Sequence, residues 1–237
     1  MTWSLIAHDR ATGAFAIAVA TKNFAVGCRV PHIAARIGAV ATQALANPFY
    51  GVNGVKLLRA GKSPEEVIAT LTASDDGRDQ RQVHVMDAAG RIAAHTGKAC
   101  VDWCGHTRGE DFSVAGNMLA GPAVIEETAK AYAANAALPL ARRLIAALKA
   151  GEAAGGDKRG RQSAALVIYG EEEWPDLDLR VDDHTDPLGE LERLERVSRE
   201  RWVHFAKFLP CSRNPHGELD RSKIDAGIAA ALAAEAR

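Results

Sequence analysis

The stretch WSLIAHDRATGAFAIAVAT, residues 3–21, determines the fold of this chain. It holds two strand-like runs around the turn DRATG, where Gly13 can supply the positive φ that such a hairpin needs. In the second run Phe15, Ile17 and Val19 point one way and alanines point the other way, so neither face is polar. Antiparallel sheets usually leave one face in water. The pattern therefore predicts a sheet that is covered by a second sheet on one face and by helices on the other.

The rest of the chain alternates strand-like and helical runs. Ser63, Pro64 and Glu66 form a helix start in which the Ser63 hydroxyl and the Glu66 carboxylate satisfy each other's main-chain amides. A helical stretch from 121 to about 150 should break near Pro139. Other helices are expected over 52–60 and 187–208, and other strands over 37–45, 81–87, 91–96, 112–119, 163–169 and 176–183.

The order of these elements predicts one main domain. No internal repeat or long linker divides them, and hairpins alternate with pairs of helices. We therefore expect an α+β domain over residues 1–209, built from two sheets with outer helices. Residues 210–237 are expected to form a loop and a peripheral, alanine-rich helix.

Composition and charge exclude several classes of protein. Hydrophobic residues make up 47% and charged residues 25% of the chain, which excludes disordered and fibrous classes. The 29 Lys and Arg residues against 30 Asp and Glu residues give a net charge of -1, so no basic excess favours nucleic acid or an anionic membrane. A small molecule or a peptide is the expected partner. The sequence is also compatible with a homo-oligomer.

The chain is expected in the cytoplasm. It has no apolar run long enough to cross a membrane, and MTWSLIAHDR lacks the basic and apolar regions of a signal peptide. The 4 cysteines are few and irregularly spaced, so we expect reduced thiols rather than a disulfide framework.

Several blocks of sequence resemble a known family. They are MTWSLIAHD, ATQALANPFYG, AAHTG, GNMLAGP, GDKRGRQSAAL and DLRVDDH. Over residues 2 to about 208 the chain is similar to an uncharacterised bacterial family grouped with the Ntn (N-terminal nucleophile) hydrolases. The resemblance implies a four-layer αββα sandwich with two central antiparallel sheets. It also implies hydrolysis of an amide bond, without naming a substrate.

Under this resemblance Thr2 is the candidate nucleophile. Threonine is small enough for Met1 to be removed, which would place a hydroxyl and a free α-amine on one residue. The reference pKa of an α-amine is about 7.7–8.0, so part of it is neutral at pH 7 and can accept the hydroxyl proton. The expected function is hydrolysis of an amide bond in a small metabolite or peptide. The alternative reading of Thr2 is an ordinary first residue of a strand.

Two further residues are candidates for catalysis. Lys22 closes the second strand, where proteasome-like members of the Ntn superfamily keep a lysine beside the threonine, and its ammonium would lower the pKa of the amine. Asn117 could donate its side-chain amide to a tetrahedral oxyanion. A surface lysine and a turn asparagine are the alternatives.

Four residues are candidates for binding the substrate. Thr42 and Gln43 at a strand end and Asn47 in the following loop could orient it, although structural hydrogen bonds would also explain them. Arg161, in the glycine-flanked segment 156–163, could grip a substrate carboxylate with its guanidinium group. The alternative for this segment is a solvated connector.

No metal or cofactor is expected. Cys100, Cys104 and His106 lack the second ligand pair of a closed zinc site. Asp182 and Asp183 are adjacent on a strand and point to opposite faces, so a salt bridge to an arginine is the better expectation. The rival of the hydrolase is a non-catalytic protein of the same fold that binds a ligand or acts as a scaffold.

Overall fold

The computed structural model describes residues 2–235 and divides into two compact units. The first unit extends to Leu191 and the second begins at Glu192. The predicted division at residues 209 and 210 stays a prediction. In the described part of the chain no helix combines the length and the apolar character required to cross a bilayer.

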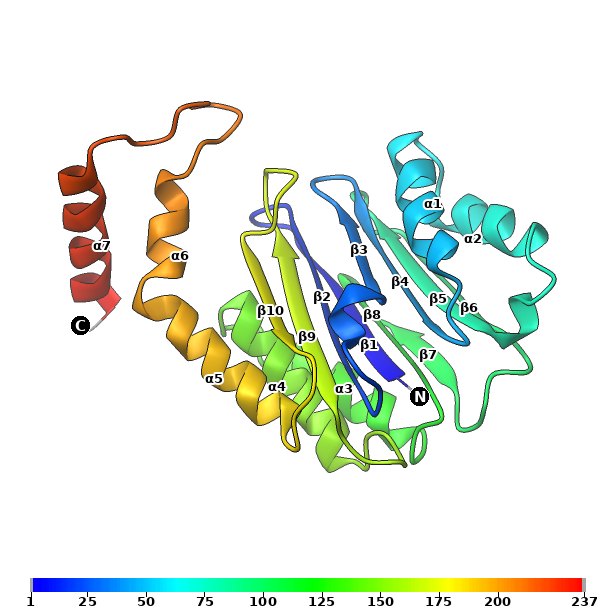
Figure 1. Ribbon diagram of the computed structural model, residues 1–237. Helices are drawn as coiled ribbons and strands as arrows, with labels where there is room; N and C mark the ends of the chain where they lie inside the picture. Colours follow the sequence, from blue (N-terminus) through cyan, green and yellow to red (C-terminus); the bar gives the residue numbers. More distant parts are fainter. Residues whose placement is uncertain (1, 236–237) are drawn as a thin grey trace. The chain divides into compact units, whose positions relative to one another are not determined.

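The first unit is a mixed α+β structure with two antiparallel sheets, as the sequence predicts (Figure 1). One sheet has 6 strands in the order β10-β9-β2-β1-β8-β7, and the other has 4 strands in the order β3-β4-β5-β6. The strands are β1 Thr2–Asp9, β2 Ala14–Thr21, β3 Pro31–Ala34, β4 Gly38–Ala44, β5 Arg81–Asp87, β6 Ile92–Thr96, β7 Gly105–Arg108, β8 Phe112–Asn117, β9 Ser163–Tyr169 and β10 Leu177–Val181.

Helices cover the outer faces of both sheets. The two sheets contact each other through β1, β2 and β8 on one side and β4 and β5 on the other. Helices α3 (Ala123–Ala134) and α4 (Leu140–Ala153) pack on the six-stranded sheet, and α1 (Pro48–Arg59) and α2 (Pro64–Ala73) pack on the four-stranded sheet (Figure 1). The first strand of the chain thus lies inside a sheet that is covered on both faces.

The hairpin formed by β1 and β2 confirms the prediction from its apolar faces. Every residue of β2 is buried. Phe15, Ile17 and Val19 share the core between the sheets with residues of β4 and β5, and the alternate alanines lie on the face where α4 packs. Gly13 has a φ of 75° in the connecting turn, as expected.

The helix starts follow from local capping chemistry. At α2 the Ser63 hydroxyl accepts from the Glu66 amide and the Glu66 carboxylate accepts from the Ser63 amide, so the predicted capping box is present. Helix α1 begins at Pro48, earlier than the predicted residue 52, because the Asn47 side chain accepts from the Phe49 amide and caps it. The predicted break separates α3 from α4, with Pro139 at the N-cap of α4.

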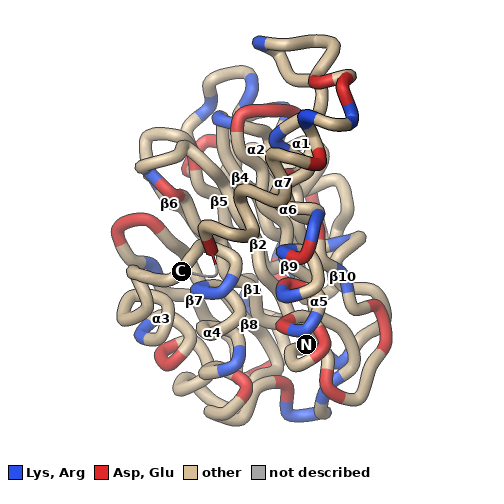
Figure 2. Tube along the Cα trace, turned by 90° about the vertical axis from the view of Figure 1, so that its left-hand side faces the viewer, with Lys and Arg blue, Asp and Glu red and all other residues tan. Residues whose placement is uncertain are grey.

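The second unit is helical. Helix α5 (Pro187–Glu200) ends in it, and α6 (Trp202–Phe205) and α7 (Arg221–Glu235) pack against each other. Arg201 and Asp225 form an ion pair there with an N to O distance of 3.1 Å. Along the chain trace, Lys and Arg residues lie among Asp and Glu residues (Figure 2).

Candidate active site at the start of β1

Thr2 is the first residue of a central strand. It lies in register with Asn117 of β8, and it is 8% exposed. Its Oγ1 is 3.1 Å from the Oγ1 of Thr21, the last residue of β2. Antiparallel pairing therefore brings one end of β1, β2 and β8 together, and with it three polar side chains from distant parts of the sequence.

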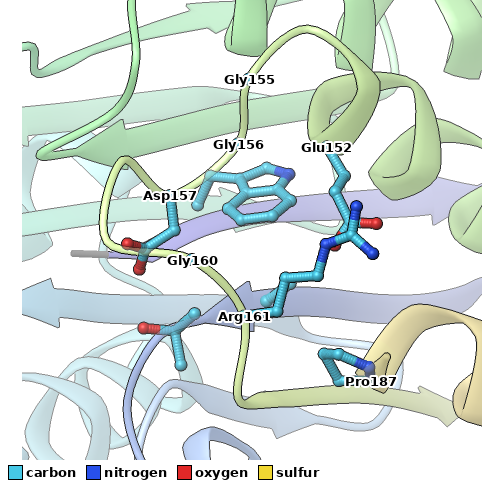
Figure 3. A pocket seen from close by; sticks show the side chains of 10 residues that line it. Glu152, Gly155, Gly156, Asp157, Gly160, Arg161 and Pro187 are labelled. Carbon is cyan, nitrogen blue, oxygen red and sulfur yellow. The ribbon is translucent and has the colours of Figure 1, made fainter. Parts of the chain in front are cut away.

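A small cleft of about 110 Å³ opens beside this point (Figure 3). It is lined by Trp3, Ala20, Thr21, Glu152, Gly155, Gly156, Asp157, Gly160, Arg161 and Pro187. Thr2 is not among the lining residues, but Thr21, whose Oγ1 lies 3.1 Å from that of Thr2, is one of them.

The glycine-rich loop at the cleft is fixed by a buried carboxylate. Gly155 has a φ of 116°, and a β-carbon there would lie 2.6 Å from the Cβ of Ala120, so the site requires glycine. The Asp157 side chain is buried and accepts from the main-chain amides of Lys22 (2.6 Å) and Arg159 (2.8 Å). This carboxylate ties the loop to the end of β2.

The structure places Arg161 at this cleft, paired with an acid. Its Nε lies 3.2 Å from Oε1 of Glu152, and the two side chains approach each other in Figure 3. Burial raises the pKa of Glu152, and the charge of Arg161 opposes that rise. The Arg161 side chain is half exposed, and its Nη1 also lies 3.9 Å from Oδ1 of Asp186.

Lys22 lies beside the same loop. Its Nζ donates to the main-chain oxygen of Arg161 at 3.0 Å, and its main-chain amide donates to Asp157. The ammonium group therefore has a contact on the loop that borders the cleft.

Asn117 and Gln43 direct their amides at the backbone of Thr2. Asn117 Nδ2 and Gln43 Nε2 each lie 3.4 Å from the carbonyl oxygen of Thr2. Both also donate to Oε1 of Gln82, at 3.0 and 2.8 Å. Gln43 Nε2 donates in addition to the main-chain oxygen of Ala115 at 3.1 Å. Sequence reasoning missed Gln82, although it alternates with Val83 and Val85 in β5 and so shares a face with His84. The spacing of two residues between Gln82 and His84 was the signal in the sequence that could have identified it.

The structure does not bring Thr42 and Asn47 to the cleft. Thr42 precedes Gln43 in β4 and so points to the opposite face, where it is fully buried. Asn47 caps α1, and its Nδ2 donates to Oδ2 of Asp75 at 3.2 Å. Both side chains therefore lie on the side of the four-stranded sheet that α1 and α2 cover, away from Thr2.

No group of three or more metal-ligating side chains occurs among residues 2–235. Cys104 donates to the main-chain oxygen of Cys100 at 3.6 Å, and His106 Nδ1 lies 3.0 Å from the Thr96 hydroxyl. Asp182 forms the expected salt bridge, with Arg180 at 3.0 Å.

A second hollow lies at another edge of the first unit. This groove of about 440 Å³ is bordered by Gly27, Pro31, His32, Ile33, Val52, Val55, Lys56, Ala165, Val167, Tyr169 and Asp178. None of the candidate residues predicted from the sequence lines it, so the smaller cleft remains the candidate active site.

Comparison with protein families places the chain. The family model described as "Family of unknown function (DUF1028)" matches residues 2–191. The chain belongs to the DUF1028 family. The DUF1028 match ends at Leu191, where the first unit also ends, and it contains every candidate site residue.

A solved structure of the same family is similar over almost the whole chain. It is the crystal structure of the DUF1028 protein SPO2555 from Silicibacter pomeroyi, which is 34% identical, with a TM-score of 0.86. The similarity covers 93% of this chain and 96% of that chain. The comparison with curated proteins gave no match. The DUF1028 description assigns no activity, so kinship with the Ntn hydrolases belongs to the proposal that follows.

Proposed function

We propose that this DUF1028 protein is an amide hydrolase of the Ntn type and that the Thr2 hydroxyl is its nucleophile. In this proposal the two sheets and their outer helices form an αββα sandwich, and removal of Met1, which lies outside the described residues, frees the α-amine. The observation that carries the proposal is the position of Thr2. It begins a central strand, and its hydroxyl bonds Thr21 at the edge of a cleft.

The chemistry then needs only groups of this chain. The neutral α-amine accepts the proton of the Thr2 hydroxyl as Oγ1 attacks the carbonyl carbon of the substrate. The C–N bond of the resulting tetrahedral intermediate breaks, and the leaving amine takes the proton. Water then hydrolyses the ester on Thr2 by the same base catalysis. The Lys22 ammonium would hold the pKa of the α-amine down.

The cleft supports a small metabolite or the end of a peptide as substrate. The cleft is small, at about 110 Å³, which suits a small metabolite or the end of a peptide better than a larger molecule. Arg161 is half exposed at its wall and can pair with a carboxylate of the substrate. The Glu152 carboxylate competes for the same guanidinium group.

Substitution at residue 2 tests the proposal. In protein that has lost Met1, Thr2→Ala should abolish hydrolysis of a panel of small amides and dipeptides. Thr2→Ser should retain part of it, because serine keeps the hydroxyl and the amine. Hydrolysis should also rise with pH as the α-amine loses its proton, with an apparent pKa of about 8 or below. Unchanged hydrolysis in Thr2→Ala would reject the mechanism, and inactivity of every form would favour the ligand-binding or scaffold protein.

A further inference from the structure

A group of buried polar side chains fills the space between the two sheets next to Thr2. Its six members are at most 2% exposed; they are Ser4, Gln43, Gln82, His84, Ser113 and Asn117. Burying polar groups is costly unless each one is hydrogen-bonded, so such a group persists only as a connected network. The proposed reaction does not by itself require one.

The hydrogen bonds of this network run in one direction. Ser4 donates its hydroxyl proton to Oε1 of Gln43 at 2.7 Å, so Ser4 Oγ must accept from His84 Nε2 at 2.9 Å. His84 then carries its proton on Nε2, and its Nδ1 accepts from the Ser113 hydroxyl at 2.9 Å. The chain of donors thus leads from Ser113 through His84 and Ser4 to Gln43.

Two amides end this network on the carbonyl oxygen of Thr2. Asn117 reaches it from the six-stranded sheet and Gln43 from the four-stranded sheet, each at 3.4 Å. Gln43 Nε2 also donates to the main-chain oxygen of Ala115 at 3.1 Å, so one of its two N–H protons is shared. Oε1 of Gln82 accepts from both amides, which fixes their orientation. Gln82 is itself held because its Nε2 donates to the main-chain oxygen of Gly116 at 2.8 Å.

The backbone after both amides is in a disfavoured conformation. Ala44, directly after Gln43, has a φ of 73°, and Met118, directly after Asn117, has a φ of 56°. Residues with a β-carbon rarely adopt this left-handed region, and such strain tends to occur at functional sites. The surrounding structure therefore holds the ends of β4 and β8 in a strained conformation. In this conformation both amides point at Thr2.

We propose that Gln43 and Asn117 are positioning residues: together they hold the carbonyl of Thr2 and so fix the direction in which its hydroxyl and α-amine point. This inference rests on the proposed function and changes the role of Asn117. Donation by Asn117 to an oxyanion would require its amide to leave Thr2 and Gln82. The network holds the residue that carries the nucleophile. Of its other four members, only Ser4 and Gln82 bond the two amides directly.

A nuclear magnetic resonance experiment can observe this contact without a substrate. Trp3 is the only tryptophan that follows a threonine, so labelling threonine carbonyl carbons with ¹³C and tryptophan with ¹⁵N gives one peak, from the Thr2–Trp3 peptide. Asn117→Asp and Gln43→Glu remove the N–H donors and nearly keep the shape. Each should move the Thr2 carbonyl shift in the direction of a weaker hydrogen bond. Asn117→Leu, which adds no charge, replaces Asn117→Asp if that variant does not fold.

The reaction of Thr2 with a β-lactone gives the second readout. In protein without Met1, Oγ1 opens the lactone ring and becomes acylated, and peptide mass spectrometry follows the rate. Asn117→Asp should slow this acylation about tenfold to a hundredfold, as expected when a reacting group is misplaced. Ser113→Ala is the matched control. It breaks the same network at its far end and should leave both the carbonyl shift and the acylation rate near wild type.

The outcomes separate the two proposals. If the carbonyl shift is unchanged in both amide variants, or if Ser113→Ala slows acylation as much as Asn117→Asp does, the positioning role is overturned. If wild-type Thr2 is not acylated at all, the nucleophile proposal fails. In that case the carbonyl shift alone decides whether the two amides hold Thr2.

Discussion

Acid should destabilise the first unit through His84. This side chain is completely buried between the sheets and hydrogen-bonds two serine hydroxyls, so the folded protein holds the neutral ring. Burial, with a smaller contribution from the charge of His106, lowers its pKa to about 3. In the unfolded chain the same ring has a pKa of about 6.5.

The size of the effect follows from these two values. Between pH 6.5 and 3 the unfolded chain binds a proton that folded His84 does not, so stability falls as the pH is lowered through this window. Each pH unit costs about 1.4 kcal/mol, so His84 removes about 2 kcal/mol of stability between pH 7 and pH 5. Burial also lowers the pKa of His8, His32 and His106, which adds to the total acid sensitivity.

The variant His84→Gln isolates the contribution of this ring. Urea unfolding of wild type and variant at pH 7 and pH 5 gives four free energies of unfolding. The variant loses stability at pH 7, because Ser113 loses its acceptor, but its loss between pH 7 and pH 5 should be smaller than that of wild type by about 2 kcal/mol. Equal losses in the two proteins would refute the assignment of a neutral, buried His84.

Three further changes test the fold and the candidate site. Ala16→Glu should lower the free energy of unfolding by about 3–5 kcal/mol, because a carboxylate would be buried under α4 without a partner. An effect below about 1 kcal/mol would contradict the conclusion that α4 covers this face of β2. Ser63→Ala should cost about 1 kcal/mol in the same urea assay through loss of the α2 cap, and no change would show that the capping box is not formed in solution. Asp157→Asn should increase proteolysis of the loop over residues 155–160, since a neutral amide accepts less strongly from the Lys22 and Arg159 amides; an unchanged cleavage rate would argue against its anchoring role.

Much of the fold could be predicted from local patterns. The hairpin of β1 and β2 has apolar residues on both faces, and the capping box of α2 identifies a helix start independently of tertiary structure. Strands β3 and β7 were not predicted. Each has 4 residues, lies at a sheet edge and is mostly half-buried or exposed, so neither gives an apolar run.

The candidate site could be predicted only in part. Thr2 and Asn117 come together because β1 pairs with β8, and that pairing is not visible in one sequence. The sequence alone could have shown that Thr42 and Gln43 do not share a site, since neighbouring strand residues point to opposite faces. Gln82 and His84 alternate with Val83 and Val85 in β5, and only the facing of the two sheets shows that their polar groups converge near Thr2.

Intact-protein mass spectrometry of native material tests the central claim most directly. The claim that Thr2 supplies both the nucleophile and the base requires a chain that begins at Thr2. The account predicts a mass lower than that of the full sequence by one methionine residue. A mass that includes Met1 in protein that hydrolyses amides would contradict it, because the α-amine would then belong to Met1.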